Sequence, residues 1–238
     1  MENNQEMKQK LAMANRILVN EGLTELGRGH VVYKLSDNRI MIPGHLHDYQ
    51  RSIADCSASD IVTIDYDGKV LEGHYPESMH EFYFYSSMFR RRPELKAALH
   101  MHSPYTNLIT MGGKSLLYSS RDSFLFVDGI KVFDGLPLFV NTPEMGEDMA
   151  NLLGKNDVLV HRGHGVFMVG RSIEEVVTRA AALERAARKS YHLYLLGNSV
   201  EYPRETIRKF HSEEIDQELE EADWGYFITR VEKKGTVF

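Results

Sequence analysis

Two histidines stand close together in the segment His100-Met101-His102. The apolar residues just before them predict a strand over 97–102. On a strand, residues i and i+2 point to the same face, so both imidazoles can reach one metal ion. Taken alone, such a pair is equally typical of histidines that are satisfied in a core or at a surface.

A second histidine cluster, His161-Arg162-Gly163-His164-Gly165, lies further along the chain between two apolar runs. Its glycines allow the backbone to pass close to a ligand. Two clusters of this kind in one chain are hard to explain by packing, and together they favour a metal site. These residues alone leave open whether His161 or His164 would be the ligand.

Apolar spacing and turn residues predict the elements that must position these clusters. A helix is predicted over 4–21, with Gly22 as its stop. Two hairpins should follow, because turn residues separate paired β-type runs at 29–33 with 39–42, and at 61–65 with 69–71.

The second half of the chain alternates less regularly. A helix is predicted from Glu77 to Arg92, ending at Pro93, and another begins at Thr142-Pro143. A capping box of Ser172 and Glu175 starts a long helix to about Leu196. Further strands are predicted at 136–140, 158–161 and 166–169. This mixed order favours an α/β fold with three α/β/α layers and a central mixed, mostly antiparallel sheet.

Composition restricts the class of protein. The chain has 238 residues, of which 42% are hydrophobic and 26% charged, with no linker or repeat, so we expect one domain over 1–238. The N-terminal residues carry interspersed charges and indicate neither a signal peptide nor a membrane span, so a cytoplasmic location is expected. The single Cys56 agrees with a reducing compartment, and the net charge of -6 gives no nucleic-acid footprint.

The order of these motifs resembles the class II aldolase and adducin family over nearly the whole chain. The shared order is a glycine turn, an acid on a helix, His-x-His-Ser-Pro-Tyr, and His-Gly before a strand. The resemblance implies that His100, His102 and His164 bind one divalent ion per subunit, which could be zinc, manganese, iron or cobalt. It makes His161 a neighbour, places the essential acid at Glu81, and implies a homotetramer with sites at subunit interfaces. Glu77 is the nearest competitor of Glu81.

The substrate turns depart from the sugar-phosphate aldolases of that family, which hold phosphate with hydroxyl-rich turns. The corresponding segments here are 27–30, 43–44 and 76–80, and most hydroxyl donors are missing. Arg28, His30 and Arg162 bring planar or cationic donors that suit a carboxylate-bearing aromatic substrate. The residues around them resemble the decarboxylase branch of the family, whose members act on hydroxylated aromatic dicarboxylates. A structural salt bridge is the alternative role for both arginines.

We therefore predict a metal-dependent carbon-carbon lyase for a small-molecule carboxylate, with decarboxylation of a hydroxylated aromatic (di)carboxylic acid placed ahead of aldol cleavage. Glu81 is the predicted proton carrier and His30 its alternative, while Arg28, Tyr105 and Arg162 are the predicted substrate contacts. Three alternatives remain: a class II aldolase for a hydroxy-carbonyl compound, an iron-dependent oxygenase on the same scaffold, and a non-catalytic adducin-like interaction module.

Overall fold

The computed structural model describes residues 4–46, 50–136, 138–197, 199–210 and 213–234. Within these residues eight strands form one sheet in the order β4-β3-β2-β1-β5-β8-β7-β6. Neighbouring strands are antiparallel except β6 and β7, which are parallel. The strands are β1 Gly29–Ser36, β2 Arg39–Pro43, β3 Ile61–Ile64, β4 Val70–Glu72, β5 Ala97–Met101, β6 Lys131–Phe133, β7 Val158–His161 and β8 Gly165–Gly170.

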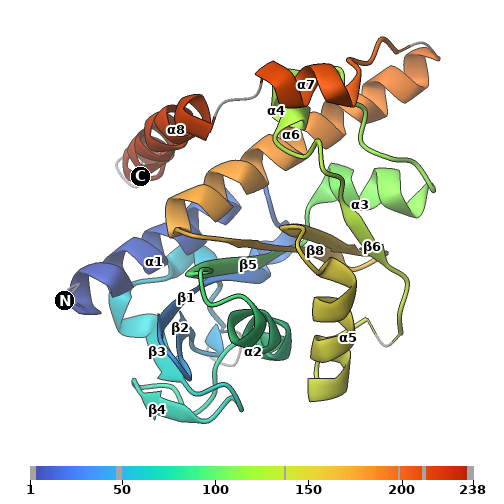
Figure 1. Ribbon diagram of the computed structural model, residues 1–238. Helices are drawn as coiled ribbons and strands as arrows, with labels where there is room; N and C mark the ends of the chain where they lie inside the picture. Colours follow the sequence, from blue (N-terminus) through green and yellow to red (C-terminus); the bar gives the residue numbers. More distant parts are fainter. Residues whose placement is uncertain (1–3, 47–49, 137, 198, 211–212, 235–238) are drawn as a thin grey trace.

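Helices lie on both faces of the sheet (Figure 1). Helices α1 (Asn4–Asn20) and α6 (Ile173–Leu196) cover one face, and α8 (Glu213–Lys234) packs on both of them. Helices α2 (Phe82–Arg91) and α5 (Pro143–Leu153) cover the other face. The shorter helices are α3 Pro104–Met111, α4 Arg121–Phe124, α7 Arg204–Phe210 and the 3-10 turns η1 Glu25–Gly27, η3 Ile53–Asp55 and η4 Ala58–Asp60. The predicted three-layer fold with a mostly antiparallel sheet is confirmed.

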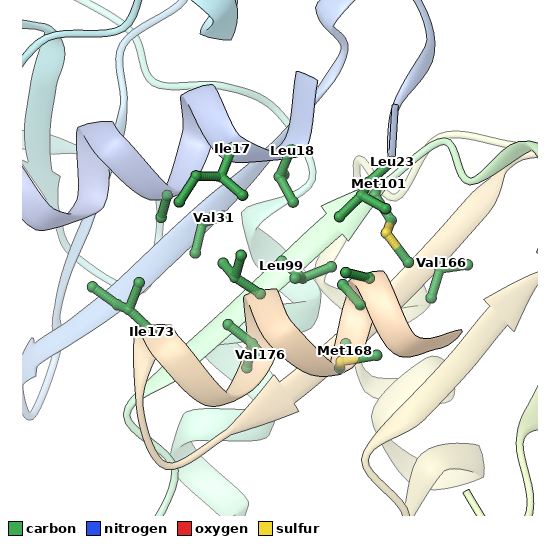
Figure 2. Close-up of a cluster of buried hydrophobic side chains, with 14 of the residues drawn as sticks. Ile17, Leu18, Leu23, Val31, Leu99, Met101, Val166, Met168, Ile173 and Val176 are labelled. Carbon is green, nitrogen blue, oxygen red and sulfur yellow. The ribbon is translucent and has the colours of Figure 1, made fainter. Parts of the chain in front are cut away.

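The sheet separates two apolar cores because strand side chains alternate between its faces. Leu99 and Met101 of β5 point toward α1 and α6, where they pack with Ile17 and Val176 (Figure 2). The side chain of His100 must therefore point the other way, toward α2 and α5. In the described part of the chain, no helix has both the length and the apolar content that a membrane span requires.

Local signals explain the ends of the longest helices. Gly22 has a φ of 67°, and the N–H of Leu23 donates to the carbonyl of Leu18 at 2.9 Å, which closes the last turn of α1. The hydroxyl of Ser172 accepts from the N–H of Glu175 at 2.9 Å and begins α6. Both predicted helices are confirmed at these ends.

The helix predicted from Glu77 is wrong in its first turn. Helix α2 begins at Phe82, and the residues before it are drawn to the sheet by a β-bridge between Gly44 and Ser78. Glu81 takes a left-handed conformation with a φ of 72°, which ends any helix at that point. Glu81 is thus the residue that precedes the helix and is not a member of it.

The strand predicted at 136–140 is also wrong within the described residues. The sheet uses the earlier residues 131–133 as β6, and residues 136 and 138–140 belong to no strand. Leu136 and Phe139 are 83% and 63% exposed, so their apolar side chains do not mark a buried strand. The N–H of Val140 donates to the Glu81 carboxylate at 3.3 Å and not to a neighbouring strand.

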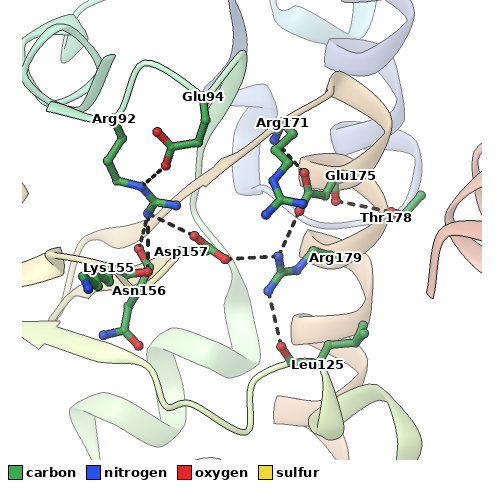
Figure 3. A network of polar contacts seen from close by, with 10 residues as sticks. All are labelled: Arg92, Glu94, Leu125, Lys155, Asn156, Asp157, Arg171, Glu175, Thr178 and Arg179. Carbon is green, nitrogen blue, oxygen red and sulfur yellow. Dashed lines mark hydrogen bonds and ion pairs between the residues drawn. The ribbon is translucent and has the colours of Figure 1, made fainter. Parts of the chain in front are cut away.

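A network of charged side chains joins α2, β7 and α6 at one end of the sheet (Figure 3). The Asp157 carboxylate accepts from Arg92 at 3.1 Å and from Arg179 at 3.3 Å. A cavity of about 690 Å³ opens beside this network and is lined in part by Arg92, Asp157, Gly170 and Arg179. Because β5 and β8 pair Ala97 with Gly170, the network and cavity lie at the opposite end of these strands from the histidines.

Candidate metal and catalytic site

Ring nitrogens of His100, His102 and His164 lie within 4.8 Å of one another. His100 is on β5, His102 follows the last residue of that strand, and His164 lies in the turn between β7 and β8. Nδ1 of His100 lies 3.1 Å from the carbonyl oxygen of Val166, which can only accept, so Nδ1 carries the proton. Nε2 of His100 then carries no proton and lies 3.0 Å from Nε2 of His102, a spacing at which both nitrogens can bind one cation.

His164 supplies the strongest sign of a missing partner. Both of its ring nitrogens are buried, and neither has a hydrogen-bond partner among the described residues. Burial lowers the pKa of His164 to about 3, and burial likewise lowers the pKa values of His100 and His102. Neutral imidazole is the form that binds metal, so these residues fit a divalent ion. Three imidazoles would leave coordination positions open for substrate oxygens.

Gly165 allows His164 to approach β5, which contains His100 and is directly followed by His102. A Cβ atom at this position would lie 2.6 Å from Cε1 of His100 and 2.6 Å from the carbonyl oxygen of Met101. Both distances are shorter than any van der Waals contact. The glycine in the His-Gly motif is therefore required by the close packing of β5 against β8.

The Glu81 carboxylate lies against the three histidines. Its oxygens are 3.1 Å from Nε2 of His100 and 3.6 Å from Nε2 of His164. Burial raises the pKa of Glu81, although the nearby His164 and the Val140 N–H oppose this effect. The competing residue, Glu77, is exposed, and no described contact joins its side chain to the histidines.

His30 lies directly opposite His100 in the pairing of β1 with β5, and the centroids of the two rings are 6.1 Å apart. Its Nε2 is 3.1 Å from the hydroxyl oxygen of Tyr85, while its Nδ1 is buried without a hydrogen-bond partner among the described residues. Burial lowers the pKa of His30 and raises that of Tyr85. The structure thus places a fourth neutral imidazole next to the three candidate metal ligands.

The two predicted substrate arginines differ in what holds them. Arg28 is exposed, and no side-chain hydrogen bond or ion pair joins it to another described residue. The Arg162 guanidinium is engaged by the Asp134 carboxylate and by the carbonyl oxygen of Thr110. The salt-bridge alternative therefore describes the geometry of Arg162, whereas Arg28 has its donors free for a ligand.

Two other residues near the motifs have structural contacts. The ring centroid of Tyr105 lies 5.6 Å from that of Tyr191 on α6, and no described contact joins Tyr105 to the three candidate metal ligands. Nε2 of His161 donates to the carbonyl oxygen of Gly135 at 2.8 Å. The described group of possible metal ligands includes His164 and not His161.

Comparison with known proteins agrees with this arrangement. Residues 9–191 match the family model described as "Class II Aldolase and Adducin N-terminal domain". The chain belongs to this family. An aldolase II superfamily protein from Pseudomonas syringae has the same fold, with a TM-score of 0.82 and 22% identity, covering 99% of this chain and 96% of that one.

Several relatives of this chain are named as decarboxylases. The 3,4-dihydroxyphthalate decarboxylase of Rhodococcus jostii (strain RHA1) is 27% identical over 200 residues, covering 80% of this chain and 81% of the relative. The 3-oxo-tetronate 4-phosphate decarboxylase of Haemophilus influenzae (strain ATCC 51907 / DSM 11121 / KW20 / Rd) is 24% identical over 204 residues, covering 84% and 92%. At the level of the family, the chain is a class II aldolase-like lyase with decarboxylase-like relatives.

Some polar groups at this family site were not predicted from the sequence. The Val140 N–H reaches Glu81, and the Asn107 side chain donates to the carbonyl oxygen of His164 at 3.0 Å. Neither residue belongs to a sequence motif. Both contacts arise because distant segments meet on one face of the sheet, and a pattern of neighbouring residues does not contain that information.

Proposed function

We propose that this lyase is a divalent-metal-dependent decarboxylase of a hydroxylated aromatic dicarboxylic acid. One observation carries the proposal: His100, His102 and His164 direct neutral imidazoles at one point, with the Glu81 carboxylate 3.1 Å from His100. The ion bound there would act as a Lewis acid and stabilise the negative charge that remains when carbon dioxide leaves.

Arg28 is the proposed ligand of a substrate carboxylate, because its five N–H donors are free of described partners and suit two-point binding. Arg162 and Tyr105 stay proposed contacts of the substrate. Arg162 would first have to exchange the Asp134 carboxylate for that of the substrate, so we expect it to contribute less to substrate binding than Arg28. Holding the substrate at two points orients the bond that breaks.

Glu81 is the proposed proton carrier. When the carbon-carbon bond breaks, the electron pair stays on the substrate carbon and carbon dioxide leaves. Glu81 in its protonated form then supplies the proton to that carbon, and solvent restores the acid. His30 is the alternative donor, because Tyr85 holds one of its nitrogens and leaves the other free.

An aldolase acting on a hydroxy-carbonyl compound is the second candidate, since it would use the same ligands and the same acid. A phosphorylated substrate, as in the name of the Haemophilus influenzae relative, is less favoured because the turns at 27–30 and 76–80 contain few hydroxyl donors. An iron-dependent oxygenase remains a further alternative. The three retained histidines argue against a non-catalytic adducin-like module.

We further propose a homotetramer with its sites at subunit interfaces, in the cytoplasm. Exposed apolar side chains support this assembly, because Phe139 is 63% exposed and its ring centroid lies 5.6 Å from that of His164. A neighbouring subunit would cover such a rim. Analytical ultracentrifugation should give a mass near four times that of one chain, and a monomer would contradict the assembly.

The proposed function is tested by metal analysis followed by product analysis. Wild type should retain close to one equivalent of a divalent metal per chain and release carbon dioxide from a hydroxylated aromatic dicarboxylate. His164→Ala should lose most of the metal, while His161→Ala, which removes a neighbouring imidazole, should retain more. An aldehyde without carbon dioxide would make the aldolase correct, and oxygen consumption would reveal an oxygenase. Full metal occupancy in His164→Ala would disprove the ligand set.

A further inference from the structure

Glu184 is a buried carboxylate in the middle of α6, and the proposed reaction does not use it. Only 8% of its surface is exposed. The donors that contact it among the described residues come from the first turn of α3 and the residue before that helix. It accepts from the Ser103 hydroxyl, from the Tyr105 N–H at 2.7 Å, and from the N–H and hydroxyl of Thr106 at 3.1 and 3.0 Å. No ion pair with a described cation competes for it.

The helix turn that Glu184 holds is joined to two of the three candidate metal ligands. His102 immediately precedes Ser103, which is the N-cap of α3. Asn107 is the fourth residue of the same helix, and its side chain donates to the carbonyl oxygen of His164 at 3.0 Å. The first turn of α3 is therefore connected to both ligands. It contacts the backbone of His164 through Asn107, and His102 lies just before the N-cap of the helix.

The third ligand is held in a different way. His100 lies within β5, where it pairs with His30 on one side and Phe167 on the other, and its ring bonds to the carbonyl of Val166. His102 lies beyond the end of the strand, so the hydrogen bonds between strands do not hold its backbone. Its backbone N–H has only the Thr24 hydroxyl at 3.3 Å as a described partner.

We propose that Glu184 is a positioning residue that fixes His102 and His164 at metal-binding distance by anchoring the start of α3. The inference rests on the metal centre of the proposed function. A glutamine at this position has one oxygen in place of two, and its NH2 group would face N–H donors. The anchor would therefore be lost with little change in side-chain volume. Groups that orient ligands in this way typically change metal affinity by about 10- to 100-fold.

Cobalt(II) is the probe, because the shape and intensity of its visible absorption report ligand geometry. Glu184→Gln should bind Co²⁺ about 10- to 100-fold more weakly than wild type and show an altered visible spectrum. Ser172→Ala is the matched control, since it removes a cap at the far end of α6, where Ser172 accepts from the Glu175 N–H at 2.9 Å. It should lower the melting temperature but leave Co²⁺ affinity and spectrum unchanged.

Asn107→Ala is a second test if Glu184→Gln does not fold. It removes the hydrogen bond from α3 to the His164 carbonyl oxygen and buries no new polar group. It should also weaken Co²⁺ binding and alter the spectrum. The inference is overturned if wild type binds Co²⁺ and the folded variants bind it with the same affinity and spectrum. If wild type itself binds no Co²⁺, the metal centre falls and this inference falls with it.

Discussion

Glu81 and His100 meet across two layers of the molecule, with a carboxylate oxygen 3.1 Å from Nε2 of the ring. The contact depends on the left-handed backbone of Glu81, whose φ is 72°. A non-glycine residue in this region costs about 1–2 kcal/mol relative to right-handed conformations. Glu81 thus takes this strained backbone at the point where its carboxylate contacts His100 and His164.

Glu81→Gln should keep the metal and lower turnover by about a hundredfold or more, because the amide occupies the same space but cannot donate a carboxylic proton. The measurement is metal content by elemental analysis together with steady-state kinetics. Turnover equal to that of wild type would assign the proton to His30 or to solvent.

The two arginines give opposite expectations. Arg28→Gln should weaken binding of a dicarboxylate much more than binding of its monocarboxylate analogue, because Arg28 has free donors for the second carboxylate. Arg162→Lys should affect both substrates alike and lower the melting temperature, since its fork holds Asp134 and the Thr110 carbonyl. Steady-state kinetics with both substrates distinguish the two roles. If Arg162→Lys selectively weakened binding of the dicarboxylate, Arg162 and not Arg28 would be the carboxylate ligand.

Gly165→Ala should weaken metal binding by about tenfold or more and destabilise the fold by about 1–3 kcal/mol, because the new methyl group would lie 2.6 Å from the His100 ring. Gly225→Ala is the control, since no atom lies within 4 Å of its added Cβ on α8. That change should stabilise the helix by up to about 1 kcal/mol. Chelator competition and thermal denaturation measure both effects, and unchanged metal affinity in Gly165→Ala would contradict the packing argument.

Helix α8 should be pH-sensitive through Glu220. Burial, with the charges of Glu175, Asp216 and Glu174, raises the pKa of Glu220 from 4.5 to about 7. The folded state thus holds a proton that the unfolded state has released, so this group lowers stability as pH rises from 4.5 to 7.

Glu220→Gln should therefore raise the melting temperature above pH 7, and the gain should vanish below pH 4.5. Melting curves across this range measure the difference. The exposed Glu218 on the same helix gives the control variant Glu218→Gln, which should reproduce little of the effect. A gain from Glu220→Gln that persists at low pH would show that charge is not the cause.

Local chemistry made much of the fold predictable. The cap at Ser172 and the glycine stop at Gly22 act within a few residues, and both predicted helices were correct at these ends. The start of α2 was wrong because Ser78 pairs with Gly44, a contact between distant segments that overrides helical propensity.

The candidate site divides in the same way. Motif spacing and the family resemblance identified the three histidines and Glu81 as candidates, and these residues lie together in the structure. Their roles stay predictions until they are tested. Glu184 and the Val140 N–H could not be predicted, because each acts through backbone groups of a segment far away in the chain.

The candidate ligands also determine when a metal can enter. His100 lies on β5 and His102 directly follows that strand, whereas His164 comes just before the adjacent strand β8. Between the two positions the chain forms α3, α4, β6, α5 and β7. Contacts between such distant segments form late in folding, because the entropy of closing the intervening loop must be overcome first. A metal ion would therefore find its complete site only after these segments have met, and its binding would then stabilise the assembled fold by mass action.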